Sequence, residues 1–142
     1  MALERGVQAS ALTKRYDLTA LVQDHARVDW VRLAERDGSV VGLAAVVFEL
    51  WNRRARLEHL YVDARARGMG VGRVLVEAAA ERSRAAGMRC LWAETQTVNE
   101  CAVDFYRHVG FTWCGFDASL YDPAEVDAGE VALFFTRALG PL

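Results

Sequence analysis

The chain has 142 residues, enough for one domain (1–142) with a buried hydrophobic core. Its formal net charge of −2 argues against a basic tract for nucleic acid or a membrane surface. No apolar run approaches the ~20 residues of a membrane span, and residues 1–6 lack the apolar core of a signal peptide. Three cysteines without Cys-x-x-Cys spacing predict neither a disulfide framework nor a metal site. These features predict a cytoplasmic protein with reduced thiols.

The alternation of apolar and polar residues predicts eight elements after a short helix, with turn residues between them. In chain order these are a helix at 16–27, strands at 30–35 and 40–50 around Asp37-Gly38, a strand at 55–62, a helix at 70–86, a strand at 89–95, a helix at 99–109, and strands at 112–121 and 130–137. This order predicts an α+β fold, with a mixed, mainly antiparallel twisted sheet and helices packed on it.

A basic, glycine-rich turn joins the strand at 55–62 to the helix at 70–86. It contains Arg65, Arg67, Gly68, Gly70, Gly72 and Arg73. Glycines have no Cβ, so an anion can approach the main chain, and the N-terminus of a helix points free N–H groups at such an anion. The arginines add charge that matches phosphate oxygens. The turn therefore predicts a pyrophosphate site, the alternative being a solvated turn with incidental glycines.

The spacing narrows the kind of pyrophosphate. A Walker loop needs a lysine after its last glycine, and the dinucleotide fingerprint needs a glycine where Arg73 stands. The pattern present is Arg-x-x-Gly-x-Gly, which begins at either Arg65 or Arg67.

A second motif lies in the helix predicted at 99–109 and reads Asn-x-x-Ala-x-x-Phe-Tyr-x-x-x-Gly-Phe. Asn99 is placed as an N-cap and Gly110 as the glycine after the helix. Ala102, Phe105 and Tyr106 share one face of this helix.

The two motifs, in this order, resemble the GNAT superfamily of N-acetyltransferases. The resemblance implies a GNAT-like sheet with helices on both faces, here with a shortened N-terminal part, and acetyl-CoA (coenzyme A) as cofactor. It also implies that an oxyanion is held by main-chain N–H groups near Leu60–Val62, where the strands splay. The implied cofactor-binding residues are Leu60, Tyr61, Val62, Arg67, Gly68, Met69, Gly70, Val71, Gly72, Arg73, Asn99 and Tyr106.

Transfer to an amine requires a base, because an alkylammonium with a pKa near 10 is about three units from its reactive form at pH 7. Glu58 stands where, by the resemblance, superfamily members place a base or a water-holding residue; the alternative is an exposed strand carboxylate. Glu94, on the next strand, is the competing base. His59 is expected on the opposite face of the sheet from Glu58.

The resemblance also places Tyr106 near the sulfur of coenzyme A, where a phenol can protonate the leaving thiolate. The alternative is a core tyrosine. Cys101 is expected to be structural, so the implied reaction is direct attack in a ternary complex without a covalent enzyme intermediate.

Three further pieces are similar to the streptothricin (nourseothricin) acetyltransferases: Trp51-Asn52, Glu94-Thr95-Gln96 and the segment 115–121. They imply a small-molecule primary amine as acceptor, such as a streptothricin-like antibiotic, and antibiotic resistance as the role. The first ~35 residues do not match that family well. The implied acceptor-binding residues are Trp51, Asn52, Glu94, Asp117 and Tyr121.

Two alternatives stay open at this point. One is N-acetylation of a different amine (a polyamine, an amino acid or a protein N-terminus), and the other is a non-catalytic acyl-CoA-binding module. Edge strands near the C-terminus favour a homodimer.

Overall fold

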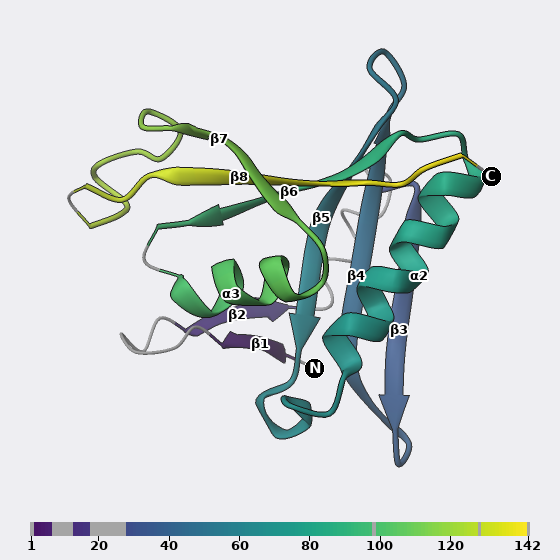
Figure 1. The fold of residues 1–142 in the computed structure, drawn as a ribbon. Coiled ribbons are helices and arrows are strands. Elements are labelled where there is room, and N and C mark those ends of the chain that lie inside the picture. The colour runs from purple at the N-terminus through teal and green to yellow at the C-terminus, as the bar shows by residue number, and fades with distance from the viewer. Residues whose placement is uncertain (1, 7–12, 18–27, 98, 128, 142) are drawn as a thin grey trace.

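The computed structural model describes residues 2–6, 13–17, 28–97, 99–127 and 129–141, which form two sheets and two α-helices (Figure 1). β1 (Ala2–Gly6) pairs antiparallel with β2 (Thr13–Asp17) in a small sheet. The main sheet has the order β3-β4-β5-β6-β8-β7. Its strands are β3 (Trp30–Arg36), β4 (Ser39–Glu49), β5 (Arg54–Val62), β6 (Cys90–Gln96), β7 (Thr112–Asp117) and β8 (Ala132–Ala138).

All neighbouring strands of the main sheet are antiparallel except β5 and β6. This parallel pairing is short, running from Arg54 opposite Cys90 to Arg56 opposite Trp92, after which the two strands diverge. The predicted α+β fold with a mixed, mainly antiparallel sheet is confirmed. The predicted Asp37-Gly38 hairpin is confirmed as well, with φ values of 51° and 77° that fit a type I′ turn.

The helices α2 (Val71–Ala85) and α3 (Glu100–His108) lie in front of the main sheet in Figure 1. Both pack on the same face, because one hydrophobic cluster joins them to the sheet, whereas helices on both faces were expected. The cluster includes Leu75, Val76 and Ala79 of α2, Tyr106 of α3, and Ala44, Val46, Ala55, Leu57, Leu91, Ala93 and Phe135 of the strands. We call this side the helix face and the other side the opposite face.

The helix ends follow the predicted capping residues. The Asn99 side chain accepts a hydrogen bond from the Ala102 amide at 3.0 Å, which confirms its N-cap role. Gly87 and Gly110, just beyond the two helices, have φ values of 82° and 90° that residues with a Cβ rarely adopt.

Two predicted boundaries were wrong. The helix expected at 16–27 begins inside β2, because pairing with β1 outweighs its weak apolar periodicity, and residues 18–27 lie outside the described part of the chain. The strand expected at 112–121 ends at Asp117, whose carboxylate accepts hydrogen bonds from the Ser119 amide and hydroxyl, both at 2.7 Å, and so closes a turn. Across the described ranges, no helix is both long and apolar enough to cross a membrane.

Candidate acetyl-CoA site and the opposite face

A cavity of about 620 Å³ lies on the helix face, between the glycine-rich turn and α3. A short 3₁₀ turn, η2 (Ala64–Ala66), precedes the glycines of the turn along the chain. The cavity is lined by residues of β5, of the turn with the start of α2, and of α3 with its flanks. These are Leu60 and Val62, then Ala66 to Gly68 and Gly70 to Arg73, then Asn99, Cys101, Ala102, Phe105, Tyr106, His108 and Val109. The structure therefore brings together all the predicted cofactor-binding residues except Tyr61 and Met69, which do not line the cavity.

The glycines shape this cavity in two ways. Gly68 and Gly70 have φ values of 76° and 80°, and both leave open space where a Cβ would stand. Gly70 directly precedes α2. At Gly72, by contrast, a Cβ would lie 3.0 Å from the Phe105 ring, so its absence lets α2 approach α3 closely. Gly68 and Gly70 therefore leave the turn open, and Gly72 allows α2 and α3 to pack closely.

The start of α2 and two arginines make the potential positive on the side of the cavity formed by the glycine-rich turn. The Val74 amide donates to the Gly70 carbonyl at 3.0 Å, so the N–H groups of the preceding first turn of α2 are free of the helix ladder. Arg67 and Arg73 also line the cavity. Backbone donors, the positive end of the helix dipole and two guanidinium groups together suit a phosphate.

Arg65 is engaged elsewhere. The Arg65 guanidinium is 2.8 Å from the Asp63 carboxylate. Hydrogen bonds from the Arg65 side chain and from its backbone amide lower the pKa of Asp63 to about 2. Arg65 does not line the cavity, whereas Arg67, Gly70 and Gly72 all do. Of the two registers open in the sequence, the geometry favours the one that begins at Arg67.

The cavity residues of β5, Leu60 and Val62, lie beyond the three residues over which β5 pairs with β6. The Asp63 amide donates to the Val41 carbonyl of β4 at 2.8 Å. Since amides alternate along a strand, those of Leu60 and Val62 point away from β4, toward the side that β6 has left. These two donors match the predicted oxyanion position near Leu60–Val62.

Tyr106 is both a cavity residue and a core residue. Its side chain is only 3% exposed, and its ring contacts those of Phe111 and Phe135 at centroid distances of 5.2 and 5.9 Å. The core role that the sequence left open is therefore real, and it does not exclude a role at the cavity.

A β-bulge in β5 determines where the candidate base points. Ala45 of β4 pairs with His59 and Val46 pairs with Leu57, so Glu58 is the extra residue without a β4 partner. Leu57 packs in the cluster on the helix face, whereas Glu58 is 3.2 Å from Arg56, a strand residue on the opposite face.

The bulge overturns the prediction for His59. Its partner Ala45 and its neighbour Tyr61 belong to a small cluster on the opposite face, and its Nδ1 lies 3.0 Å from the Tyr61 hydroxyl. His59 is therefore on the same face as Glu58. Strict alternation failed because the extra residue shifts every later side chain of β5 by one position.

Charged side chains cover the opposite face beside Glu58. Glu49 of β4 is 2.9 Å from Arg54 and 3.6 Å from Arg56. The Arg54 guanidinium lies 4.3 Å above the Trp92 ring of β6. Sequence reasoning did not single out these residues, although the i, i+2 spacing of Arg54, Arg56 and Glu58 on one strand places them on one face.

Two of the predicted acceptor-binding residues meet on this face. Glu94 follows Trp92 by two residues on β6, so both side chains point to the same side of the sheet. The Tyr121 hydroxyl, from the connection between β7 and β8, donates a hydrogen bond to the Glu94 carboxylate.

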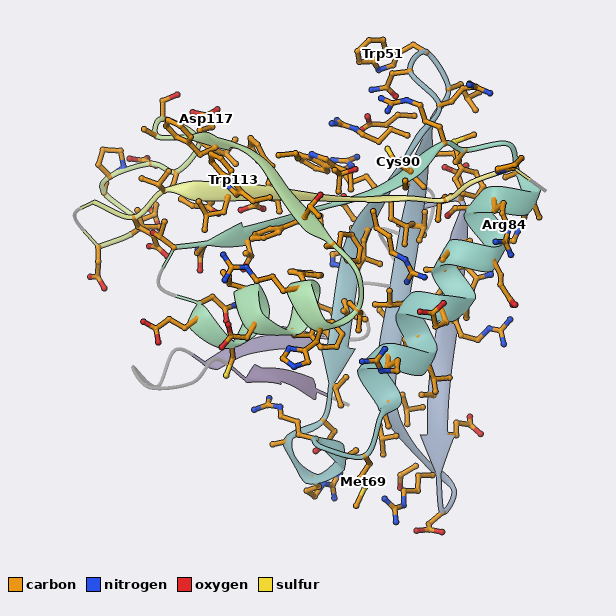
Figure 2. All side chains as sticks on the ribbon, viewed as in Figure 1. Trp51, Met69, Arg84, Cys90, Trp113 and Asp117 are labelled. Atoms are coloured by element: carbon orange, nitrogen blue, oxygen red, sulfur yellow. The ribbon has the colours of Figure 1, made fainter. Side chains whose placement is uncertain are left out.

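The other three predicted acceptor-binding residues lie in turns. Trp51 is 86% exposed at the tip of the β4–β5 hairpin, far from Met69 of the glycine-rich turn (Figure 2). The Asn52 side chain accepts a hydrogen bond from the Arg54 amide at 3.2 Å and so stabilises that tip. Asp117 closes the turn after β7, where the Ser119 hydroxyl and amide lower the pKa of its carboxyl. The structure does not bring these three residues to the cavity.

Metal ligation has no structural support in the described ranges, where no group of three or more His, Cys, Asp or Glu side chains could hold an ion. Among the cysteines, Cys90 is buried in the sheet and Cys101 is a cavity residue.

Comparisons with known proteins agree with this geometry. A profile of the acetyltransferase (GNAT) family matches residues 4–111. A streptothricin acetyltransferase from Streptomyces lavendulae is 41% identical over 100 residues, or 70% of this chain and 52% of that protein. One from Escherichia coli is 33% identical over 85 residues, or 60% of this chain and 49% of that protein. The chain thus spans about half the length of the curated relatives it matches.

Solved structures extend the likeness to nearly the whole chain. The crystal structure of a nourseothricin acetyltransferase has a TM-score of 0.74 and 32% identity, covering 98% of this chain and 85% of that one. A protein from Bacillus anthracis, crystallised in complex with acetyl coenzyme A, has a TM-score of 0.75 at 21% identity, covering 99% of this chain and 87% of that one. At that identity it shows the shared fold. With the family profile matched over most of its length, the chain belongs to the acetyltransferase (GNAT) family.

Proposed function

We propose that the chain is an acetyl-CoA-dependent N-acetyltransferase that acetylates a primary amine of a small molecule, such as a streptothricin-like antibiotic. One observation carries the proposal most directly. The cavity between the glycine-rich turn and α3 is lined by Leu60 and Val62, in the part of β5 that no longer pairs with β6, and a thioester bound there would meet an amine approaching from the opposite face. Relatives named streptothricin and nourseothricin acetyltransferases support this acceptor class.

The residues lining the cavity fit the cofactor in order. The turn from Arg67 to Arg73 would hold the pyrophosphate through the amides at the start of α2 and two guanidinium groups. Asn99 would flank the pantetheine arm, and the amides of Leu60 and Val62 would face the thioester carbonyl. Acetyl-CoA supplies the activated acetyl group.

The chemistry then needs a proton acceptor and a proton donor. A carboxylate on the opposite face removes the proton from the ammonium, directly or through one water, and the amine attacks the acetyl carbonyl in a ternary complex. Glu58 is our first choice for this base, because the bulge turns it to the opposite face beside the divergence of the strands. Glu94, which Tyr121 hydrogen-bonds, is the competing base. Tyr106 is the proposed proton donor to the leaving thiolate.

The test is an acetylation assay with a panel of amines: a streptothricin, spermidine, free amino acids and a short peptide. Release of the coenzyme A thiol and the acetylated product are measured for each amine, and we expect the highest kcat/KM with the streptothricin. Preference for another amine would move the proposal to a different acceptor. Binding of acetyl-CoA without turnover of any amine would support a non-catalytic acyl-CoA-binding module instead.

A further inference from the structure

We propose that Arg56 is a positioning residue that fixes the carboxylate of Glu58 for proton transfer. The inference rests on the proposed role of Glu58 as base. It starts from the bulge, because Glu58 has no partner in β4 to hold its backbone in a regular ladder. Its long side chain is about one third exposed, so it needs a contact of its own to keep one orientation.

Arg56 provides that contact. Its Nε lies 3.2 Å from Oε2 of Glu58 and 3.6 Å from Oε1 of Glu49, so the guanidinium bridges two carboxylates on neighbouring strands. The Nε atom is itself buried and has no hydrogen-bond partner among the described residues, although the side chain as a whole is 39% exposed, so its contacts with the two carboxylates are charge contacts. A charge whose inner nitrogen is covered is screened less than an ordinary surface ion pair.

The far end of this bridge is anchored. Arg54 donates from Nε to Glu49 at 2.9 Å, and its second nitrogen lies at the same distance from that carboxylate. Arg54 is in turn held against the ring of Trp92. A continuous series of contacts therefore runs from β6 through Arg54, Glu49 and Arg56 to the bulge. The series gives Arg56 a fixed place from which to orient Glu58.

The experiment is a double-mutant cycle with Arg56→Met, Glu58→Gln and the double variant, measuring kcat, both KM values and thermal stability. We expect Arg56→Met to lower kcat about 10-fold or more, as a misplaced catalytic group does, with KM for acetyl-CoA unchanged. In the double variant the loss should equal that of Glu58→Gln alone, because there is then no base to position. Arg56→Lys keeps the charge and should recover part of kcat.

Arg137→Met is the matched control. Arg137 forms an ion pair with Glu77 of α2 at 2.9 Å and is away from the opposite face, so this variant should lose stability without losing kcat. Additive losses in the cycle, or a kcat loss in Arg137→Met of the same size, would overturn the positioning role. A rise in acceptor KM alone would make Arg56 an acceptor-binding residue instead. Wild-type kcat in Glu58→Gln would refute the base and the inference together, whereas a loss there with a normal Arg56→Met refutes only the inference.

Discussion

β5 contributes residues to both faces of the main sheet, but the two faces present different kinds of residues. The helix face presents a cavity lined by glycines, apolar side chains and two arginines. The opposite face presents long charged side chains that hold one another in place, from Glu49 to Glu58. In the proposed function, recognition of the cofactor depends on backbone shape, and recognition of the acceptor depends on the identity of the side chains on the opposite face. Substitutions on the proposed acceptor face would therefore leave the cavity on the helix face unchanged.

The bulge at Glu58 is what divides the strand between these two tasks. Beyond it, Leu60 and Val62 reach the cavity, while His59 and Tyr61 turn to the opposite face. Without the extra residue, the later side chains of β5 would exchange faces. The same irregularity thus serves both halves of the proposed site.

Gly70→Asp should have the largest effect, because it places a carboxylate in the open space at the start of α2. At ~100 Kd of acetyl-CoA the wild type should gain about 2.7 kcal/mol of stability, several degrees in Tm, and the variant should gain none. Gly70→Asn is the matched control, since it has the same shape and the same backbone burden at φ 80° without the charge. An unchanged shift in Gly70→Asp, or a shift with ATP in place of acetyl-CoA, would contradict the pyrophosphate site.

Tyr106→Phe tests the hydroxyl of the tyrosine that lines the cavity. If the hydroxyl protonates the leaving thiolate, kcat should fall by ~10²-fold with little change in acetyl-CoA affinity. Both quantities follow from steady-state kinetics and a binding titration. Equal kcat in the variant would leave Tyr106 as the core residue that its contacts with Phe111 and Phe135 already make it.

Glu58→Gln and Glu94→Gln test the opposite face. Removing the base should lower the rate at neutral pH, and the rate should recover as pH rises toward the pKa of the amine, because the substrate then deprotonates without help. We expect this recovery in Glu58→Gln, and a raised acceptor KM in Glu94→Gln. Exchanged phenotypes would make Glu94 the base. Without pH recovery in either variant, an ordered water would be the proton acceptor.

The contrast between the faces also explains what the sequence could predict. The glycine-rich turn and the Asn99 cap were found because each depends on a local backbone requirement that only a few residue types meet. The divergence of β5 and β6 came from the family resemblance, and the structure has it. The orientation of His59 was missed because a bulge leaves no reliable mark in one sequence.

The acceptor residues were predicted less well for a related reason. Trp51-Asn52 was read from likeness to relatives, and a likeness in a hairpin tip can reflect turn geometry as well as binding. Glu94 and Tyr121 lie 27 positions apart, and only the fold brings them together. The roles of all five acceptor-binding residues stay predictions.

The smallest expected effect is that of Asp63→Asn, at the joint between β5 and the glycine-rich turn. Asp63 has a folded pKa of about 2 against 3.8 ordinarily, because the Arg65 side chain and amide hydrogen-bond to it. Its ionised form therefore stabilises the fold above about pH 4, and this contribution is lost as pH falls toward 2. Asparagine keeps the oxygen that accepts from the Arg65 amide, so the variant should be less stable by up to ~1 kcal/mol at pH 7, the range of exposed ion pairs. Urea unfolding should show this difference shrinking with acid and with salt; a difference that persists at pH 2 would have to come from the turn itself.

The variant also frees Arg65 beside the cavity, so an unchanged Kd for acetyl-CoA would assign the phosphate register to Arg67, whereas tighter binding would show that Arg65 can also reach the phosphate.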